Sequence, residues 1–134
     1  MTYPVPTPTP QTQHYWDEVR EHRLPIQFCS SCRRHYVYAR DFCRYCGSAA
    51  VEWRVACGRA RLVSYVINHR VGPAFEPYSP VIALVELEEG VVMMSNIVNV
   101  AADPKVLQLD MPLQLCFEDR NGLVLPVFEP ARAA

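Results

Sequence analysis

The sequence contains no apolar run long enough to cross a membrane. The longest runs, Val81–Val85 and Val91–Met94, are far shorter than the roughly 20 residues that span a bilayer. No charged segment followed by an apolar stretch opens the chain, so no signal peptide is predicted. The net charge of -1 gives no general attraction to nucleic acid or anionic membranes. A cytoplasmic protein is therefore expected, in a compartment that keeps thiols reduced.

The sequence also lacks the common motifs of catalysis. It has no GxSxG, no glycine-rich phosphate loop, no HExxH and no pair of carboxylates with an evident role. His69, between Asn68 and Arg70, belongs to the best polar cluster, but a lone histidine there is more often a hydrogen-bonded loop residue than a base. No catalytic residue is therefore predicted. Activity of the chain alone would need a nucleophile and a base that cannot be assigned.

What the sequence does have is six cysteines, four of them in two CxxC pairs ten residues apart: Cys29, Cys32, Cys43 and Cys46. This spacing suits one tetrahedral zinc ion held by four thiolates, whereas two disulfides are the alternative. Four sulfur ligands leave no open position, so the zinc, one ion per chain, is predicted to be structural. Cys57 and Cys116, outside the pairs, are expected to be small buried side chains.

With 134 residues the chain is one domain by length, or a small module joined to a modest core. Composition divides it into four segments: a proline-rich flexible tail at 1–10, an N-terminal docking helix at 11–25, a zinc ribbon at 26–53 and a barrel at 54–130. Prolines at every second position favour extended polyproline II in the first segment. That tail is either mobile or a strap that lies in a partner's groove.

The expected helix has clear boundaries in the sequence. Thr9 is a candidate cap with a proline after it, and Pro25 is predicted to end the helix. An aromatic-aliphatic stripe at helical spacing comprises Tyr15, Trp16, Val19 and Arg23. A helix this short must bury its stripe, either on its own domain or on a partner chain.

Aromatic and basic residues surround the four cysteines. The aromatic side chains include Tyr36 and Tyr38 and are expected to shield the thiolates. Arginines at 33, 34, 40 and 44 make the ribbon basic. Three explanations remain open: binding of nucleic acid, binding of the phosphates of a nucleotide-like cofactor, or compensation of the negative tetrathiolate zinc site.

The remainder of the chain has the pattern of short strands. Apolar residues predict five strands, at 62–68, 81–87, 91–98, 113–117 and 123–128. Glycines at 90 and 122 indicate hairpin turns, and Asp103-Pro104 indicates a short helical turn after the third strand. A long loop at 70–80 carries Phe75 and Tyr78. This order suits a small Greek-key barrel of the OB type.

A series of short motifs follows in fixed order from about residue 14 to 130. They are Tyr15-Trp16, the two cysteine pairs with Gly47-Ser48 after the second, Glu52-Trp53, Ser64-Tyr65, His69-Arg70, Ala83–Leu87 with Glu89-Gly90, Asn96, Met111-Pro112, Phe117-Glu118 and Leu125–Phe128. In this order the series resembles the DUF35 family, OB-fold proteins with a rubredoxin-like zinc ribbon that accompany thiolase-like enzymes. The resemblance implies a mainly β fold: an N-terminal helix, a rubredoxin-like zinc ribbon and a C-terminal five-stranded OB-type barrel.

Four positions depart from the family pattern. Arg33, Ala60 and Asp110 stand where glycines are usual, and Ala39 stands where a proline is common. All four touch turns or strand entries rather than metal ligands, so they leave the expected fold intact.

The resemblance also implies a function. The chain would be a non-catalytic partner of a thiolase-like subunit, in a hetero-oligomer of two plus two chains that acts on acyl-CoA. The partner would carry out acyl transfer, or retro-aldol cleavage of a CoA thioester such as a sterol side-chain intermediate. The chain would supply docking surface and part of the acyl-CoA passage, with a CoA thioester at the shared site.

Particular residues are assigned to these implied roles. The candidate CoA-phosphate ligands are Arg33, Arg34, Arg40, Arg44 and Arg70, because a guanidinium fork suits phosphate geometry. The candidate docking residues are Tyr15, Trp16, Val19, Tyr36, Tyr38, Phe75 and Tyr78. The alternative function is single-stranded nucleic-acid binding, which both modules support elsewhere. The predicted barrel is acidic, which disfavours that alternative.

Overall fold

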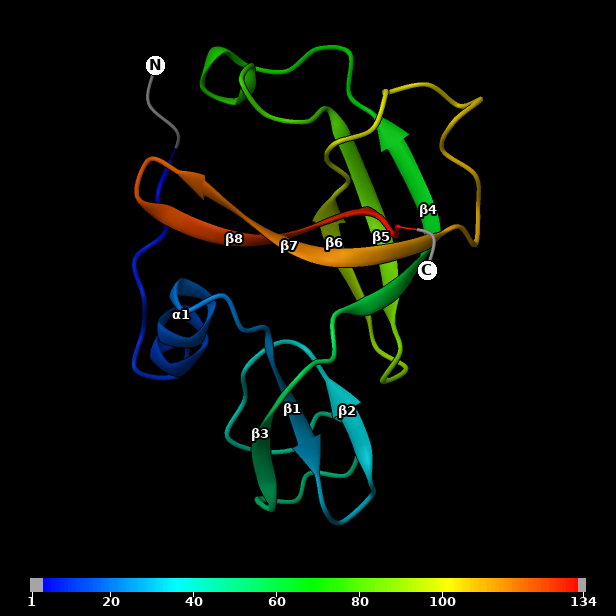
Figure 1. Ribbon diagram of the computed structural model, residues 1–134. Helices are drawn as coiled ribbons and strands as arrows, with labels where there is room; N and C mark the ends of the chain where they lie inside the picture. Colours follow the sequence, from blue (N-terminus) through cyan, green and yellow to red (C-terminus); the bar gives the residue numbers. More distant parts are fainter. Residues whose placement is uncertain (1–3, 133–134) are drawn as a thin grey trace.

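The computed structural model describes residues 4–132, so the first three residues of the predicted tail lie outside the described part. One helix, α1 (Gln13–Arg20), precedes a three-stranded sheet and a five-stranded sheet. Figure 1 shows α1 beside both sheets, with the small sheet at one end of the molecule and the large sheet at the other. Residues 4–10 are exposed along α1. Within the described residues, no helix is long and apolar enough to span a bilayer.

The helix is shorter than the sequence predicted. Thr12, not Thr9, precedes its first residue, because Thr9 and Thr12 close a turn of their own with a Thr12 N–H to Thr9 carbonyl bond of 3.0 Å. At the other end, His22 adopts a positive φ of 61° and stops the helix before Pro25. Arg23 therefore leaves the expected stripe, and its Nε donates to the Glu18 carboxylate at 2.8 Å.

The small sheet holds the ribbon. Its strands are β1 (Pro25–Cys29), β2 (Arg34–Tyr36) and β3 (Val51–Val55), antiparallel in the order β2-β1-β3. The central strand β1 is buried throughout, including the polar Gln27. The Gln27 amide oxygen accepts a hydrogen bond of 2.8 Å from the Arg40 backbone N–H, which satisfies this buried group.

The large sheet forms the predicted barrel. Its strands are β4 (Arg59–Ile67), β5 (Val81–Leu87), β6 (Val92–Asn96), β7 (Pro112–Arg120) and β8 (Leu123–Pro130). They lie in the order β6-β5-β4-β7-β8, and a parallel bridge between Ile97 and Phe128 joins the two edges. The barrel is thus nearly closed, and the OB-type fold is confirmed.

Two connections between strands of the barrel contain a short helical turn. A short 3-10 helix, η1 (Pro73–Phe75), lies in the loop between β4 and β5. Between β6 and β7, the N–H groups of Val106 and Leu107 both bond the Asp103 carbonyl, at 2.9 and 3.0 Å. This single turn occupies the place predicted for a helical turn.

One hydrophobic core spans both sheets. Ile26 and Val37 from the ribbon segment, and Leu24 just before it, are buried together with barrel residues such as Leu62 and Phe128. The ribbon therefore packs against the barrel instead of hanging from a linker. A second, much smaller cluster surrounds the paired cysteines.

Replacing Arg33 with glycine is expected to stabilise the chain. Arg33 has a φ of 60°, a region where a side chain costs roughly 1 kcal/mol and glycine costs little. The side chain is exposed, so its removal leaves no cavity. We expect a gain of about 1 kcal/mol in the free energy of unfolding, measured by urea denaturation of the zinc-bound protein. Arg33→Ala removes the same charge but keeps the strain, so an equal gain there would contradict this account.

Candidate functional site

The four paired cysteines meet at one point. Their sulfur atoms all lie within 4.8 Å of one another, and two cross-pair distances, Cys29 to Cys46 and Cys32 to Cys43, are 3.6 Å. A tetrahedral ion with zinc–sulfur bonds of about 2.3 Å would separate its sulfur ligands by about 3.8 Å. The donor set and its spacing therefore fit a structural zinc ion with four thiolate ligands.

The backbone of each knuckle turns toward the sulfur atoms. The Arg33 N–H bonds the Cys29 carbonyl at 2.7 Å, and the Gly47 N–H bonds the Cys43 carbonyl at 2.9 Å. Gly47 has a φ of 78°, which explains a glycine directly after the second pair. The Tyr45 N–H points at the Cys43 sulfur at 3.3 Å, an arrangement that stabilises a thiolate.

The four paired cysteine thiols differ in pKa. Burial by itself would raise the pKa of Cys43, but the backbone N–H groups of Cys46 and Tyr45 lower it to about 6. The Cys32 N–H is the largest cause that lowers the pKa of Cys29. Burial and the hydrogen bond to Cys43 raise the pKa of Cys32 to about 12. The four thiols thus differ in pKa, and a bound metal would displace the protons that remain on them.

The other two cysteines lie apart from this group. The expectation of a buried Cys57 is wrong, because its side chain is exposed and its Sγ donates to the Glu88 carboxylate at 3.0 Å. Burial raises the pKa of Cys57, and the bond to Glu88 raises it further. Cys116 is half-buried on β7, and burial raises its pKa to about 11. Neither thiol has the depressed pKa of a reactive cysteine.

The five candidate arginines do not form one cluster. Arg34 and Arg44 both lie close to the Tyr45 ring, with guanidinium carbons 4.9 and 5.1 Å from its centroid. Arg33 lines the same shallow hollow as Arg34 and Tyr45. Arg40 lies in a different hollow beside Phe42. Arg70 is exposed in the barrel loop, where its backbone N–H bonds the Asn68 side chain at 3.1 Å.

The candidate docking residues fall into three groups. Val19 and Tyr36 are fully buried in the chain, so we remove them from the proposed docking surface. Tyr15, Trp16 and Tyr38 line an apolar hollow of about 270 Å³ between α1, the ribbon and β6. The rim of this hollow is open, because 61% of Tyr38 is exposed. We call it the helix–ribbon hollow.

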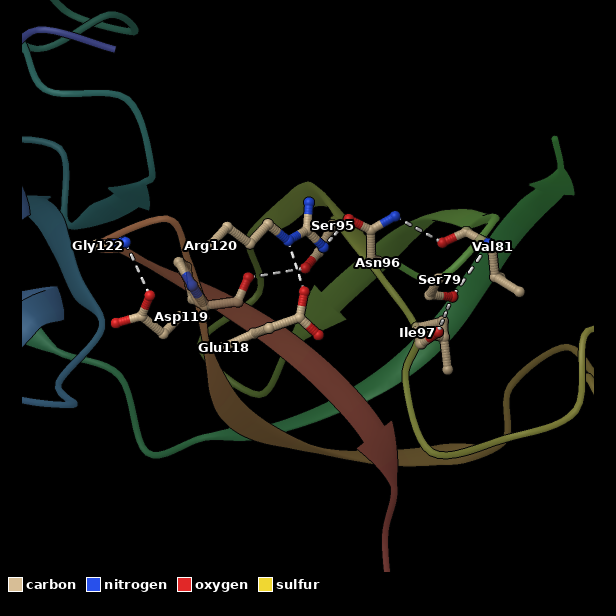
Figure 2. Close-up of polar contacts among 10 residues, drawn as sticks. Ser79, Val81, Ser95, Asn96, Ile97, Glu118, Asp119, Arg120 and Gly122 are labelled. Carbon is tan, nitrogen blue, oxygen red and sulfur yellow. Dashed lines mark hydrogen bonds and ion pairs between the residues drawn. The ribbon is translucent and has the colours of Figure 1, made fainter. Parts of the chain in front are cut away.

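Phe75 and Tyr78 instead line a larger cavity of about 440 Å³, together with residues of β5, β6, β7 and β8. We call it the barrel cavity. Its one charged lining residue is Arg120, which is only 4% exposed and which no sequence motif had indicated as a site residue. Arg120 is held by the Glu118 carboxylate at 2.5 Å and the Asn96 side-chain oxygen at 2.9 Å (Figure 2). Glu118 and Arg120 are two apart on one strand and so share a face, the signal that could have revealed the pair.

Comparison with known proteins adds two family matches. Residues 16–52 match the model described as ChsH2, rubredoxin-like zinc ribbon domain. Residues 53–118 match the model described as ChsH2, C-terminal OB-fold domain.

Three curated relatives cover most of the chain. It is 34% identical over 96% of its length to a probable enoyl-CoA hydratase alpha subunit of Thermomonospora curvata. It is 33% identical over 93% of its length to the 3-oxo-4,17-pregnadiene-20-carboxyl-CoA hydratase alpha subunit of Mycobacterium tuberculosis. The chain spans only 40% and 39% of these two relatives. A DUF35 domain-containing scaffold protein of Pyrococcus furiosus is 29% identical, with 86% of the chain and 88% of that protein covered.

A solved structure is similar over nearly the whole chain. It is described as "Ltp2-ChsH2(DUF35) aldolase", with a TM-score of 0.82 and 32% identity. The match covers 96% of this chain and 100% of that chain. Sequence and fold therefore agree on one family.

Proposed function

The chain belongs to the DUF35 family, in the ChsH2 form with a rubredoxin-like zinc ribbon and an OB-fold domain, and from that membership we propose that it is a non-catalytic accessory subunit. Its partner would be a thiolase-like enzyme that transfers acyl groups or cleaves a CoA thioester by a retro-aldol reaction. The chain would provide a docking surface and part of the acyl-CoA passage. A reducing compartment such as the cytoplasm would keep its thiols available for zinc.

The names of the relatives support a multi-subunit function. Two of them are alpha subunits of CoA-thioester hydratases, one is a scaffold protein, and the similar solved structure pairs ChsH2 with Ltp2 in an aldolase. This chain's own metal site is compatible with a supporting role. Four sulfur ligands leave zinc no open coordination position for a substrate, so the ion would only stabilise the fold of the ribbon.

The observation that carries the docking proposal is the helix–ribbon hollow. It brings Trp16 and Tyr38 together with Met94, whose side chain is 61% exposed on β6. Trp16 is half-buried, whereas Tyr38 and Met94 are exposed, and apolar side chains gathered in this way around one hollow are typical of a protein-binding surface. Aromatic anchors in such hollows commonly carry most of the binding energy. Phe42, also 61% exposed, extends the apolar surface along the ribbon.

The ribbon offers a position for the phosphates of CoA. Among the five candidate arginines, Arg34 and Arg44 both have guanidinium carbons about 5 Å from the centroid of the Tyr45 ring (4.9 and 5.1 Å), so two cations and an exposed ring lie within one small area. Guanidinium groups bind phosphate in a bidentate manner, and an aromatic face can stack on a nucleobase. We therefore propose Arg34 and Arg44, with Arg33 in the same hollow as Arg34, as the CoA contacts, and leave out Arg40 and Arg70, which lie elsewhere.

The charges of the barrel give no support to the nucleic-acid alternative. Residues 58–130 carry five basic and nine acidic side chains. Carboxylates already pair with the strand arginines Arg59, Arg61 and Arg120. A groove for single strands requires basic residues along the backbone path, which this surface does not offer.

The proposal predicts a stable complex with a thiolase-like protein. We expect the purified chain to co-elute with that protein in size-exclusion chromatography, as two plus two chains, and to raise its activity on an acyl-CoA substrate. Trp16→Ala and Tyr38→Ala should each weaken binding roughly tenfold or more, because each removes an aromatic anchor. Titration calorimetry would measure the affinities.

Leu109→Ala serves as the matched control, because Leu109 is 63% exposed but lies outside the helix–ribbon hollow. Its affinity should stay within a factor of two of the unmodified chain. Equal losses in all three variants would remove the hollow as the docking surface. Turnover by the isolated chain would overturn the accessory function itself.

A further inference from the structure

The barrel cavity is large and mostly apolar. At about 440 Å³ it is within the usual size range of small-molecule sites. Its floor comes from the barrel strands and includes Ile82, Met93 and Val127. Its outer wall is the loop between β4 and β5, with Phe75 at the end of η1 and Tyr78 just after it. Aliphatic, thioether and aromatic groups therefore face the same space.

The polar groups of the cavity are largely engaged within the protein. The Ser95 hydroxyl donates to the Pro126 carbonyl at 3.0 Å, and the Ser79 hydroxyl donates to the Ile97 carbonyl at 2.5 Å (Figure 2). The Asn96 amide donates to the Val81 carbonyl at 2.9 Å. These bonds fix the side chains and leave the lining with little demand for a polar ligand.

The charge in the cavity is compensated. Arg120 is the one charged side chain in the lining, and the Glu118 carboxylate lies 2.5 Å from its Nε. An anionic ligand would have to compete with Glu118 for this guanidinium and would lose hydration on entry. Burial raises the pKa of Tyr15 to about 12, so that phenol also stays neutral. The cavity thus favours neutral ligands over anions.

Arg120 also shapes the aromatic wall. Its guanidinium carbon lies 4.6 Å from the centroid of the Tyr78 ring, a cation–π contact between β7 and the loop. Because Asn96 and Glu118 hold the guanidinium, the Tyr78 ring has a fixed support. Arg120 is therefore a positioning residue for the wall of the cavity.

We propose that the barrel cavity binds a neutral, bulky and largely apolar group. In the complex proposed above this group would be the acyl body of the CoA thioester, whereas the anionic nucleotide end would remain on the ribbon. That identification rests on the proposed function. The preference for a neutral apolar ligand rests on the cavity alone.

Three naphthalene dyes with the same ring system test the proposal on the full chain. Prodan carries a neutral ketone, 6-dimethylamino-2-naphthoic acid carries a carboxylate, and 2-dimethylaminonaphthalene carries neither. We expect Prodan to bind one per chain with a blue-shifted emission, and the unsubstituted amine to bind within a few-fold of it. The carboxylate should bind at least tenfold more weakly. Equal or tighter binding of the carboxylate would overturn the proposal.

Variants locate the bound dye. Tyr78→Ala and Phe75→Ala should each weaken Prodan binding about fivefold or more, whereas Tyr78→Phe keeps the ring and should retain affinity. Phe75 is 40% exposed, so its variant should fold even if Tyr78→Ala does not. Tyr38→Ala, in the helix–ribbon hollow, is the control and should bind normally. Loss of binding in Tyr38→Ala with full binding in Phe75→Ala would place the dye in the other hollow and refute the proposal.

The two proposals can fail separately. Dye binding in the barrel cavity with no thiolase-like partner bound would leave the cavity proposal standing and remove its acyl-CoA interpretation. Partner binding at full affinity without selective dye binding would refute the cavity proposal and leave the proposed accessory function standing.

Discussion

Removal of the zinc ion is expected to unfold residues 26–53 and to abolish partner binding. Among the described residues, the cluster around the metal site contains three buried side chains, those of Cys29, Tyr36 and Cys43, which are too few to hold the knuckles by hydrophobic contacts. Structural zinc contributes roughly 10 kcal/mol in comparable small sites. Without it, four thiols that differ in acidity would be left around an empty centre.

The damage should extend into the barrel. Ile26 and Val37 of the ribbon belong to the same core as Leu62 and Phe128, so an unfolded ribbon would expose one side of the barrel to water. We therefore expect lower thermal stability of the whole chain, not only local opening. The helix–ribbon hollow would also lose Tyr38, which stands on the ribbon side.

Cys43→Ser and Cys57→Ser form a matched pair for this test. Cys43 is buried among the ligands, whereas Cys57 is an exposed cysteine outside the group. Zinc content, limited proteolysis within residues 26–53 and partner affinity should change in the first variant and stay normal in the second. A metal-free chain that binds its partner at full strength would contradict the structural role of the metal.

Phe128→Ala is expected to remove about 4 kcal/mol from the free energy of unfolding. The Phe128 side chain is 0% exposed on β8. Its backbone pairs with Ile97 and accepts a 2.8 Å bond from the Val98 N–H, where the edges of the barrel meet. The substitution would leave a cavity at this junction. Such a loss is a large part of the roughly 5–15 kcal/mol that stabilises a typical domain.

Urea denaturation measures this effect, with Phe42→Ala as the control. Phe42 is the same residue type but 61% exposed on the ribbon, so its truncation should change the free energy of unfolding by less than about 0.5 kcal/mol. Similar decreases in the free energy of unfolding in both variants would show that the buried Phe128 ring stabilises the chain no more than an exposed ring does.

The metal site and the barrel could be predicted from the sequence because both depend on the spacing of residues that lie close together in the chain. Two CxxC pairs place sulfur atoms on tight knuckles, and alternating apolar residues define strands. Glycine at 122 gave the β7–β8 hairpin for the same reason, since its φ of 84° is open to few other residues. Arg33 and Asp110, which stand where glycines are usual in the family, both take positive φ angles, 60° and 67°.

The burial of particular side chains could not be predicted from the sequence in this way. Val19 and Tyr36 were assigned to a docking surface, yet both are buried within the chain, and Cys57 was expected inside but is exposed. An apolar stripe indicates that one face of a helix must be buried, but it does not indicate whether the same domain or another chain buries it. That depends on contacts between segments far apart in the sequence.

The amino-acid sequence alone therefore determined the four-thiolate knuckles and the order of the strands along the chain, since both follow from short-range geometry, and its series of short motifs indicated the family by resemblance. Only the tertiary structure decided that ribbon and barrel share one core, which aromatic residues stay exposed, and that Arg120 lies buried beneath Tyr78. Residues 78 and 120 are distant along the chain, and closure of the barrel is what brings them together.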